Sequence, residues 1–156
     1  MVYQNSQMTR INCGIPPKDL TDKHLLAEHR EIKRIPNCIA NGKYDMKGQP
    51  KEFTLGTGHV KFFYDKLGYL LIRYHQLYGE CMLRGFDVEC YGDAWNNVPK
   101  HLMNDYKPTE RDIAIVKERI ALRLSESGDY TNTRGDMDII SKRMSKKMAR
   151  HLDKSK

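Results

Sequence analysis

The stretch from residue 57 to residue 85, TGHVKFFYDKLGYLLIRYHQLYGECMLRG, has the clearest helical pattern in the chain. Its apolar residues recur at steps of three and four, which places them on one face of a helix; they are Val60, Phe63, Leu67, Leu70, Tyr74, Leu77 and Cys81. Gly85 is a common helix terminator. We therefore predict one amphipathic helix from about Thr57 to Arg84, with the Cys81 thiol buried and unpaired in the core.

Another helix is predicted earlier in the chain, beginning near Asp19 or Thr21, either of which could cap it. At about 100° per residue, its apolar side holds Leu25, Ile32, Ile35 and Ile39. A different side holds the basic residues Lys23, Arg30 and Arg34. The border between the two sides holds His24 and Glu31. Pro36 should kink or end this helix, because proline has no N–H and its ring clashes with the preceding turn.

A third long helix should begin at Thr109, with Asp112 in a capping-box arrangement. Its apolar face holds Ile113, Val116, Ile120 and Leu124. Residues 125–136 are polar and favour a linker, whereas residues 142–150 could form either a basic amphipathic helix or a solvated tail. No stretch suggests paired strands. We predict an all-α fold, in which a single compact domain of about three main helices is followed by a basic C-terminal tail.

The composition favours an acidic partner. The chain has 156 residues, enough for one domain, with a formal net charge of +7 and a sequence pI near 9.2. Such a charge suits a phosphate backbone, although an ordinary basic protein would share it. The four cysteines form no Cys-x-x-Cys pair, so we expect no zinc site. We expect no membrane span, no signal peptide and a reducing cytoplasmic location.

The start of the chain suggests a nucleophile. Translation from Met8 would leave Thr9 as the first residue of the mature protein, with residues 1–7 as an extension that is then absent. A terminal α-amine has a pKa of about 7.7–8.0, against about 10.4 for lysine, so more of it is a nucleophile near neutral pH. Nearby arginines would lower this pKa further. An amine, the carboxylate of Glu31 and several arginines together suit an imine-forming enzyme that acts on a polyanion.

Three blocks in one order carry a family resemblance: residues 8–12 (MTRIN), residues 24–34 (HLLAEHREIKR) and residues 56–67 (GTGHVKFFYDKL). In these blocks the chain resembles the pyrimidine-dimer DNA glycosylases typified by bacteriophage endonuclease V, over residues 8–124. The resemblance implies a few helices with the N-terminal segment threaded between them, and residues 125–156 as linker and tail. It further implies Thr9 as the nucleophile, Glu31 as the essential glutamate, and three DNA-contacting arginines, namely Arg10, Arg30 and Arg34.

The resemblance also implies a reaction and a substrate. The expected substrate is double-stranded DNA containing damaged pyrimidines or abasic sites, handled by a monomer without a metal or other cofactor. The amine would displace the base to form an imine, and a carboxylate would then promote β-elimination of the 3′ phosphate. The chain departs from the family pattern in its residues 1–7, in a shorter region after Pro36, and in a tail whose only aromatic residue is Tyr130.

Some alternatives stay open at this level. A non-enzymatic DNA-binding protein on the same scaffold would keep residues 1–7, and a metal-dependent nuclease would need an acidic cluster that the sequence lacks. Glu31 could be only a helical partner of Arg34. Glu28 falls in the apolar seam and needs a buried partner, for which Arg10 or backbone amides are candidates. His24 could orient the N-terminal segment or sit in the core. Thr57 and His59 could cap the helix that begins near Thr57.

Overall fold

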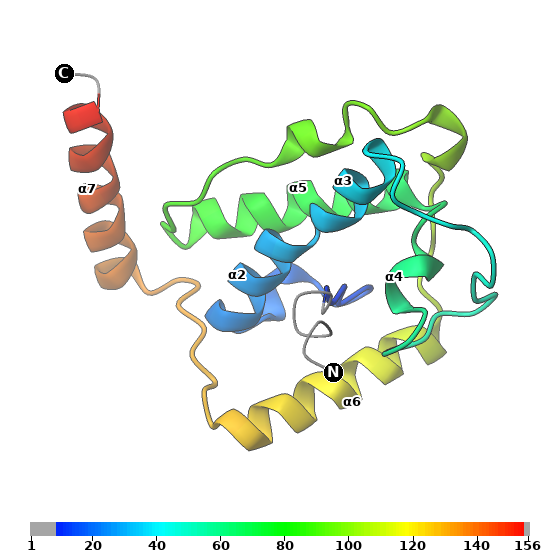
Figure 1. Ribbon diagram of the computed structural model, residues 1–156. Coiled ribbons are helices and arrows are strands. Elements are labelled where there is room, and N and C mark those ends of the chain that lie inside the picture. Colours follow the sequence, from blue (N-terminus) through cyan, green and yellow to red (C-terminus); the bar gives the residue numbers. More distant parts are fainter. Residues whose placement is uncertain (1–8, 155–156) are drawn as a thin grey trace.

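The computed structural model describes residues 9–154, and every regular element in this range is helical (Figure 1). The all-α prediction is therefore confirmed. In chain order the elements are η1 (Pro17–Asp19), α2 (Asp22–Glu31), α3 (Arg34–Ala40), α4 (His59–Phe62), α5 (Leu67–Leu83), η2 (Gly92–Trp95), η3 (Lys100–Leu102), α6 (Glu110–Ser127) and α7 (Met137–Lys154). The expected extension, residues 1–7, lies outside the described residues.

Helices α2 and α3 replace the single kinked helix expected around Pro36. The Thr21 hydroxyl caps α2 by accepting the His24 N–H at 3.2 Å. Pro36 has no N–H to donate to the carbonyl of Ile32, four residues earlier, so the helical ladder breaks just there. The predicted kink is confirmed, but Pro36 lies inside α3 instead of ending a helix.

The prediction of one continuous helix from Thr57 to Arg84 is wrong. Gly58 adopts a left-handed conformation, with φ of 91°, and starts the short α4; α5 begins only at Leu67. Phe62, the last residue of α4, and Phe63, which follows it, are buried together, with ring centroids 5.1 Å apart. The Lys66 ammonium donates to the Phe62 carbonyl at 2.9 Å, which satisfies a carbonyl left without a helical partner.

The predicted core face of α5 is confirmed. Five of its predicted apolar residues have no exposed surface, and they are Leu67, Leu70, Tyr74, Leu77 and Cys81. Cys81 carries a free thiol, as predicted. Helix α5 packs against α2, and the N-terminal segment runs between these two helices on one side and α6 on the other (Figure 1). The threaded arrangement is therefore also present.

Helix α6 begins with the predicted capping box, in which the Thr109 hydroxyl accepts the Asp112 N–H and the Asp112 carboxylate accepts the Thr109 N–H. It continues to Ser127, three residues beyond the predicted end of its apolar face, and ends at the left-handed Gly128. The basic tail forms a helix, α7, which stands at the C-terminal end of α5 (Figure 1). None of the helices in residues 9–154 has both the length and the apolar character that crossing a membrane requires.

Two glycines of α5 provide a test of this packing. Gly68→Ala should destabilise the fold, because the new Cβ would lie 2.9 Å from the Met103 carbonyl oxygen and 3.1 Å from that of Asn104. Gly79→Ala should instead stabilise it by up to about 1 kcal/mol, since alanine is the better helix former and nothing lies within 4 Å. Urea unfolding of both variants measures the difference. A stabilising effect at Gly68 would contradict the close approach of residues 103 and 104 to α5.

Candidate functional site

Three successive residues of the N-terminal segment are held by different helices. The Arg10 N–H donates to Glu31 Oε1 of α2 at 3.3 Å. The Ile11 N–H donates to His59 Nε2 of α4 at 3.0 Å. The Asn12 side chain bridges α2 and a further helix, α6, through Glu28 and Arg119. Because consecutive residues are anchored in different directions, the path of the chain at its first described residues is closely determined.

A buried ion pair lies beneath this segment. Arg73 of α5 donates to both carboxylate oxygens of Glu28 of α2, at 2.7 and 2.9 Å, and both side chains are almost completely buried. Arg73 also donates to the Ile15 carbonyl at 2.6 Å. Arg73 was not singled out from the sequence, although Glu28 in an apolar seam indicated that some partner was needed. A bidentate pair with further hydrogen bonds is the arrangement that makes a buried charge tolerable.

Asn12 connects this ion pair to α6. Its amide nitrogen donates to Glu28 Oε1 at 2.9 Å, and its amide oxygen accepts from Arg119 at 2.7 Å. Two helices on opposite sides of the N-terminal segment therefore contact the same side chain. The hydrogen bonds of Asn12 with Glu28 and Arg119 set the separation of α2 and α6 at this point.

His59 acts as a neutral acceptor. Its Nδ1 lies 2.8 Å from the Thr54 carbonyl and must donate to it, which leaves Nε2 to accept the Ile11 N–H. Burial lowers the pKa of His59 to about 4, against the opposing effect of the hydrogen bond to Thr54. The expectation that His59 caps a helix is wrong, because Gly58 occupies the N-cap of α4 and no side chain caps this helix. The imidazole binds the N-terminal segment instead.

A pocket of about 360 Å³ opens between the N-terminal segment, α2 and α6. It brings together charges of both signs from all three elements. The N-terminal segment contributes Arg10 and Asn12; α2 contributes Lys23, His24, Glu28 and Glu31; α6 contributes Arg119, Arg123 and Glu126. Glu28 is already neutralised by Arg73. The Glu31 side chain is only 14% exposed and forms the acidic wall next to the anchored Arg10 amide.

Three arginines on the pocket wall repel one another. Burial, followed by the positive charge of Arg10, lowers the pKa of Arg119 to about 10. Burial and the charge of Arg123 likewise lower the pKa of Arg10, with Glu31 acting in the opposite direction. A bound anion would relieve this repulsion and accept several hydrogen bonds. Guanidinium groups are well suited to phosphate, so the pocket has the electrostatics of a phosphate-binding site.

His24 faces the same pocket. Among the described residues, its Nδ1 is the one buried side-chain nitrogen or oxygen without a hydrogen-bond partner. Burial lowers the pKa of His24, and the positive charges of Arg119 and Lys23 lower it further. The ring is therefore held neutral, with a polar atom available to a ligand or a water molecule. The sequence had left its role open between orienting the N-terminal segment and packing in the core.

The structure brings together some of the predicted site residues and not others. Thr9 is 4% exposed and precedes the anchored Arg10 directly. Arg10 and Glu31 share the pocket. Arg30 is largely exposed and lies 3.6 Å from Glu31, whereas Arg34 begins α3 and is not among the residues that line the pocket. Their catalytic and DNA-binding roles stay predictions.

Sequence reasoning did not single out Arg119 and Arg123. They lie four residues apart on α6, on either side of the half-buried Ile120. A pair of basic residues beside an apolar helix face was the sequence pattern that could have indicated them. Within residues 9–154, no group of three His, Cys, Asp or Glu side chains is arranged to hold a metal ion. The reactive groups that line the pocket are a carboxylate, clustered guanidinium groups and a neutral imidazole.

These features define a helical protein whose pocket suits a phosphate-bearing substrate and offers an acid for proton transfer. A comparison with known families is consistent with this class: the model of the pyrimidine dimer DNA glycosylases matches residues 8–91, more than half of the chain. The chain belongs to this family. Its general function is therefore that of a DNA glycosylase that acts on pyrimidine dimers in DNA. Helices α6 and α7 lie beyond the matched range.

The buried His59 predicts how stability depends on pH. Its folded pKa of about 4 lies below the ordinary value of 6.5, so between these values the unfolded chain binds a proton that the folded chain does not. Stability from this group is fully present above pH 6.5 and is lost as pH falls toward 4, by about 3 kcal/mol in total. Urea unfolding across this pH window measures the loss.

A matched pair of variants isolates the His59 contribution. His59→Gln keeps a terminal amide oxygen that can accept the Ile11 N–H, but it does not titrate, so its stability should fall less over the same window. His75→Gln changes an exposed histidine of α5 and should keep the parental dependence. Identical pH dependence in all three proteins would show that His59 is not the buried neutral acceptor described above.

Proposed function

We propose that this chain excises damaged pyrimidines through an imine to the α-amine of Thr9 and then nicks the strand by β-elimination. The observation that carries the proposal is the hydrogen bond from the Arg10 N–H to Glu31, at 3.3 Å. It fixes the residue after Thr9 against the carboxylate of the pocket. The proposal includes translation from Met8 and removal of that methionine, since only then does Thr9 carry a reactive amine.

The distances support this assignment of roles. Consecutive backbone nitrogens lie within roughly 4 Å of each other. The Thr9 nitrogen therefore lies within roughly 7 Å of Glu31 Oε1, given the 3.3 Å contact made by Arg10. Within this limit, one bridging water molecule can connect the amine to the carboxylate, which provides a route for proton transfer. Burial of Thr9 and the nearby arginines would both favour the neutral, nucleophilic amine.

The proposed reaction balances as two linked steps. First, the Thr9 amine attacks the sugar carbon that bears the damaged base, the glycosidic bond breaks, and the departing base takes up the proton that the amine loses. The bond from the same carbon to the ring oxygen then opens, this oxygen takes up a proton, and a protonated imine forms. Second, the protonated imine acidifies the hydrogen on the adjacent sugar carbon. Glu31 removes that hydrogen, and the electron pair expels the 3′ phosphate. Hydrolysis of the imine would then release the enzyme. An abasic site enters the same sequence at imine formation.

The arginines supply the binding of DNA in this proposal. Arg10, Arg119 and Arg123 bind the phosphates that flank the lesion, since their mutual repulsion is relieved by an anion. Arg30 and Arg34 bind the backbone farther out, on the exposed side of α2 and at the start of α3. The enzyme acts on double-stranded DNA as a monomer. A lesion drawn out of the duplex would bring its sugar to the pocket.

Glu31→Gln tests the proposal most simply. Glutamine can still accept the Arg10 N–H, but it cannot remove a proton, so strand cleavage should fall by about 10²–10⁴-fold. Binding of damaged duplex should be retained or slightly strengthened, because a negative charge is lost beside the arginines. Single-turnover cleavage of an oligonucleotide with one pyrimidine dimer measures the first effect, and a gel-shift titration measures the second.

Glu126→Gln is the matched control. It removes the same charge from the same pocket but from the α6 wall, away from the Arg10 amide. It should cleave within a few-fold of the parental rate, and both variants should keep the helical circular dichroism of the parent. Near-parental cleavage by a folded Glu31→Gln protein would remove Glu31 from the mechanism. A parent that binds damaged duplex without cleaving it would favour a non-enzymatic DNA-binding protein instead.

A further inference from the structure

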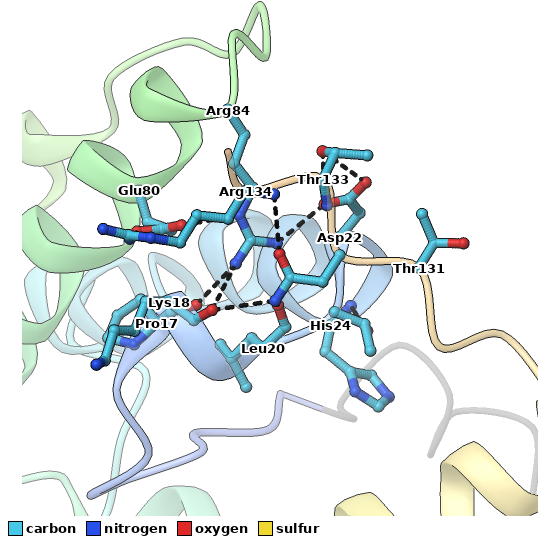
Figure 2. Close-up of polar contacts among 12 residues, drawn as sticks. Pro17, Lys18, Leu20, Asp22, His24, Glu80, Arg84, Thr131, Thr133 and Arg134 are labelled. Carbon is cyan, nitrogen blue, oxygen red and sulfur yellow. Dashed lines mark hydrogen bonds and ion pairs between the residues drawn. The ribbon is translucent and has the colours of Figure 1, made fainter. Parts of the chain in front are cut away.

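Residues 129–136, here called the strap, connect the end of α6 to α7 and cross the first turn of α2 (Figure 2). The backbone of the strap is bonded to the body, since the Asp22 N–H donates to the Thr131 carbonyl at 2.8 Å. The Asn132 side chain donates to the carbonyls of Lys18 and Leu20, at 3.0 and 3.1 Å. A stretch whose composition indicated a linker is therefore a bonded part of the structure.

Asp22 is the centre of these contacts. Its Oδ1 accepts from Thr133 N–H at 3.1 Å, from the Thr133 hydroxyl at 3.0 Å and from Arg84 at 2.9 Å (Figure 2). Arg84 is completely buried at the end of α5 and also pairs with Glu80 at 2.8 Å. Glu80 in turn pairs with Arg134 of the strap. One carboxylate thus joins the start of α2, the end of α5 and the strap.

Helix α7 secures the other end of the strap. Arg143 donates to the Thr133 hydroxyl at 2.7 Å and to the Arg84 carbonyl at 3.0 Å, and it lies 3.6 Å from Asp22. Its guanidinium also stacks over the Phe86 ring, 4.2 Å from the centroid. The neighbouring Lys142 is exposed. Arg143 therefore holds α7 against the strap and the end of α5, whereas Lys142, which has the same charge, is exposed.

The strap ends at the walls of the pocket. Its first residue, Asp129, lines the pocket, and so do Lys23 and His24, which directly follow Asp22. On the opposite wall, Arg123 and Glu126 belong to a part of α6, residues 120–127, in which no residue is buried. This part of α6 has little packing of its own to hold it. The strap ties its end to the first turn of α2, and in Figure 2 the His24 ring points away from the network.

We propose that the strap and α7 set the width of the pocket, with Asp22, Thr133 and Arg143 as positioning residues for Arg123 on one wall and His24 on the other. The inference rests on the proposed function for its catalytic consequence, but its structural consequence can be measured alone. It concerns a part of the chain beyond the residues 8–91 that match the family.

Arg143→Gln and Lys142→Gln form the decisive pair, because each removes one positive charge from adjacent positions of α7. Amide hydrogen exchange should become faster in Arg143→Gln at residues 22–24 and 120–128, and stay unchanged at residues 70–81 in the core of α5. In cleavage of a duplex with one abasic site, kcat of Arg143→Gln should be at least about tenfold lower than that of Lys142→Gln. The change in KM should be smaller, because a displaced pocket wall misaligns the reacting groups. Arg143→Lys keeps the charge without the two-pronged contact and should fall between them.

Thr133→Val provides a second variant in case Arg143→Gln fails to fold. It keeps the volume of threonine while removing the hydroxyl shared by Asp22 and Arg143, and it should reproduce the local increase in exchange. Equal exchange and equal kcat in the Arg143→Gln and Lys142→Gln proteins would overturn the proposal. So would faster exchange throughout α5, which indicates general destabilisation. If the parent itself does not cleave, the proposed function fails, while the exchange comparison still decides the role of the strap.

Discussion

The buried ion pair between Glu28 and Arg73 is the constraint on which the rest of the structure depends. It joins α2 to α5 within the core and, through Asn12 and the Ile15 carbonyl, holds the N-terminal segment between them. Removing one partner of such a pair typically costs about 3–5 kcal/mol, because the other charge is left buried and uncompensated. Burying two charges costs desolvation energy. Two apolar side chains would avoid that cost, but they could not form the hydrogen bonds to Asn12 and to the Ile15 carbonyl.

The consequences spread outward from that pair. Asn12 accepts from Arg119, so the side chain that fixes the N-terminal segment also positions this arginine of α6. His59 then orients the adjacent residue, Ile11, from another direction. The pocket is thus assembled from elements that are distant in sequence but share one buried hydrogen-bond network. Asn12 lies between α2, which carries the acidic wall, and α6, which carries arginines, and its amide group is hydrogen-bonded to both helices.

Local patterns were sufficient for much of the fold. The Thr21 cap, the capping box at Thr109 and the apolar face of α5 all depend on residues within a few positions of each other, and all three are confirmed. The break between α4 and α5 was missed because the apolar spacing continues across it. What stabilises that break is the burial of two adjacent phenylalanines and a lysine contact, which periodicity does not record.

The site was less accessible to sequence reasoning, for a related physical reason. Arg10 and Glu31 were expected together on the strength of a family resemblance, and they do line one pocket. Arg119 and His59 contribute through hydrogen bonds to residues far away in the chain, and Arg123 contributes by lining the same pocket as Arg10. No local pattern contains these relations. The strap is the extreme case, because the polar residues that suggested a linker find their partners at Asp22, 111 positions away from Thr133.

The central claim is that the Thr9 α-amine is the nucleophile, held next to Glu31 by the anchored N-terminal segment. Borohydride reduction during cleavage of a duplex with one abasic site, followed by peptide mapping of the trapped complex, tests this claim most directly. The account predicts a single covalent adduct on the terminal nitrogen of a chain that begins at Thr9. An adduct on a lysine, or efficient cleavage by a chain that retains residues 1–7, would contradict it.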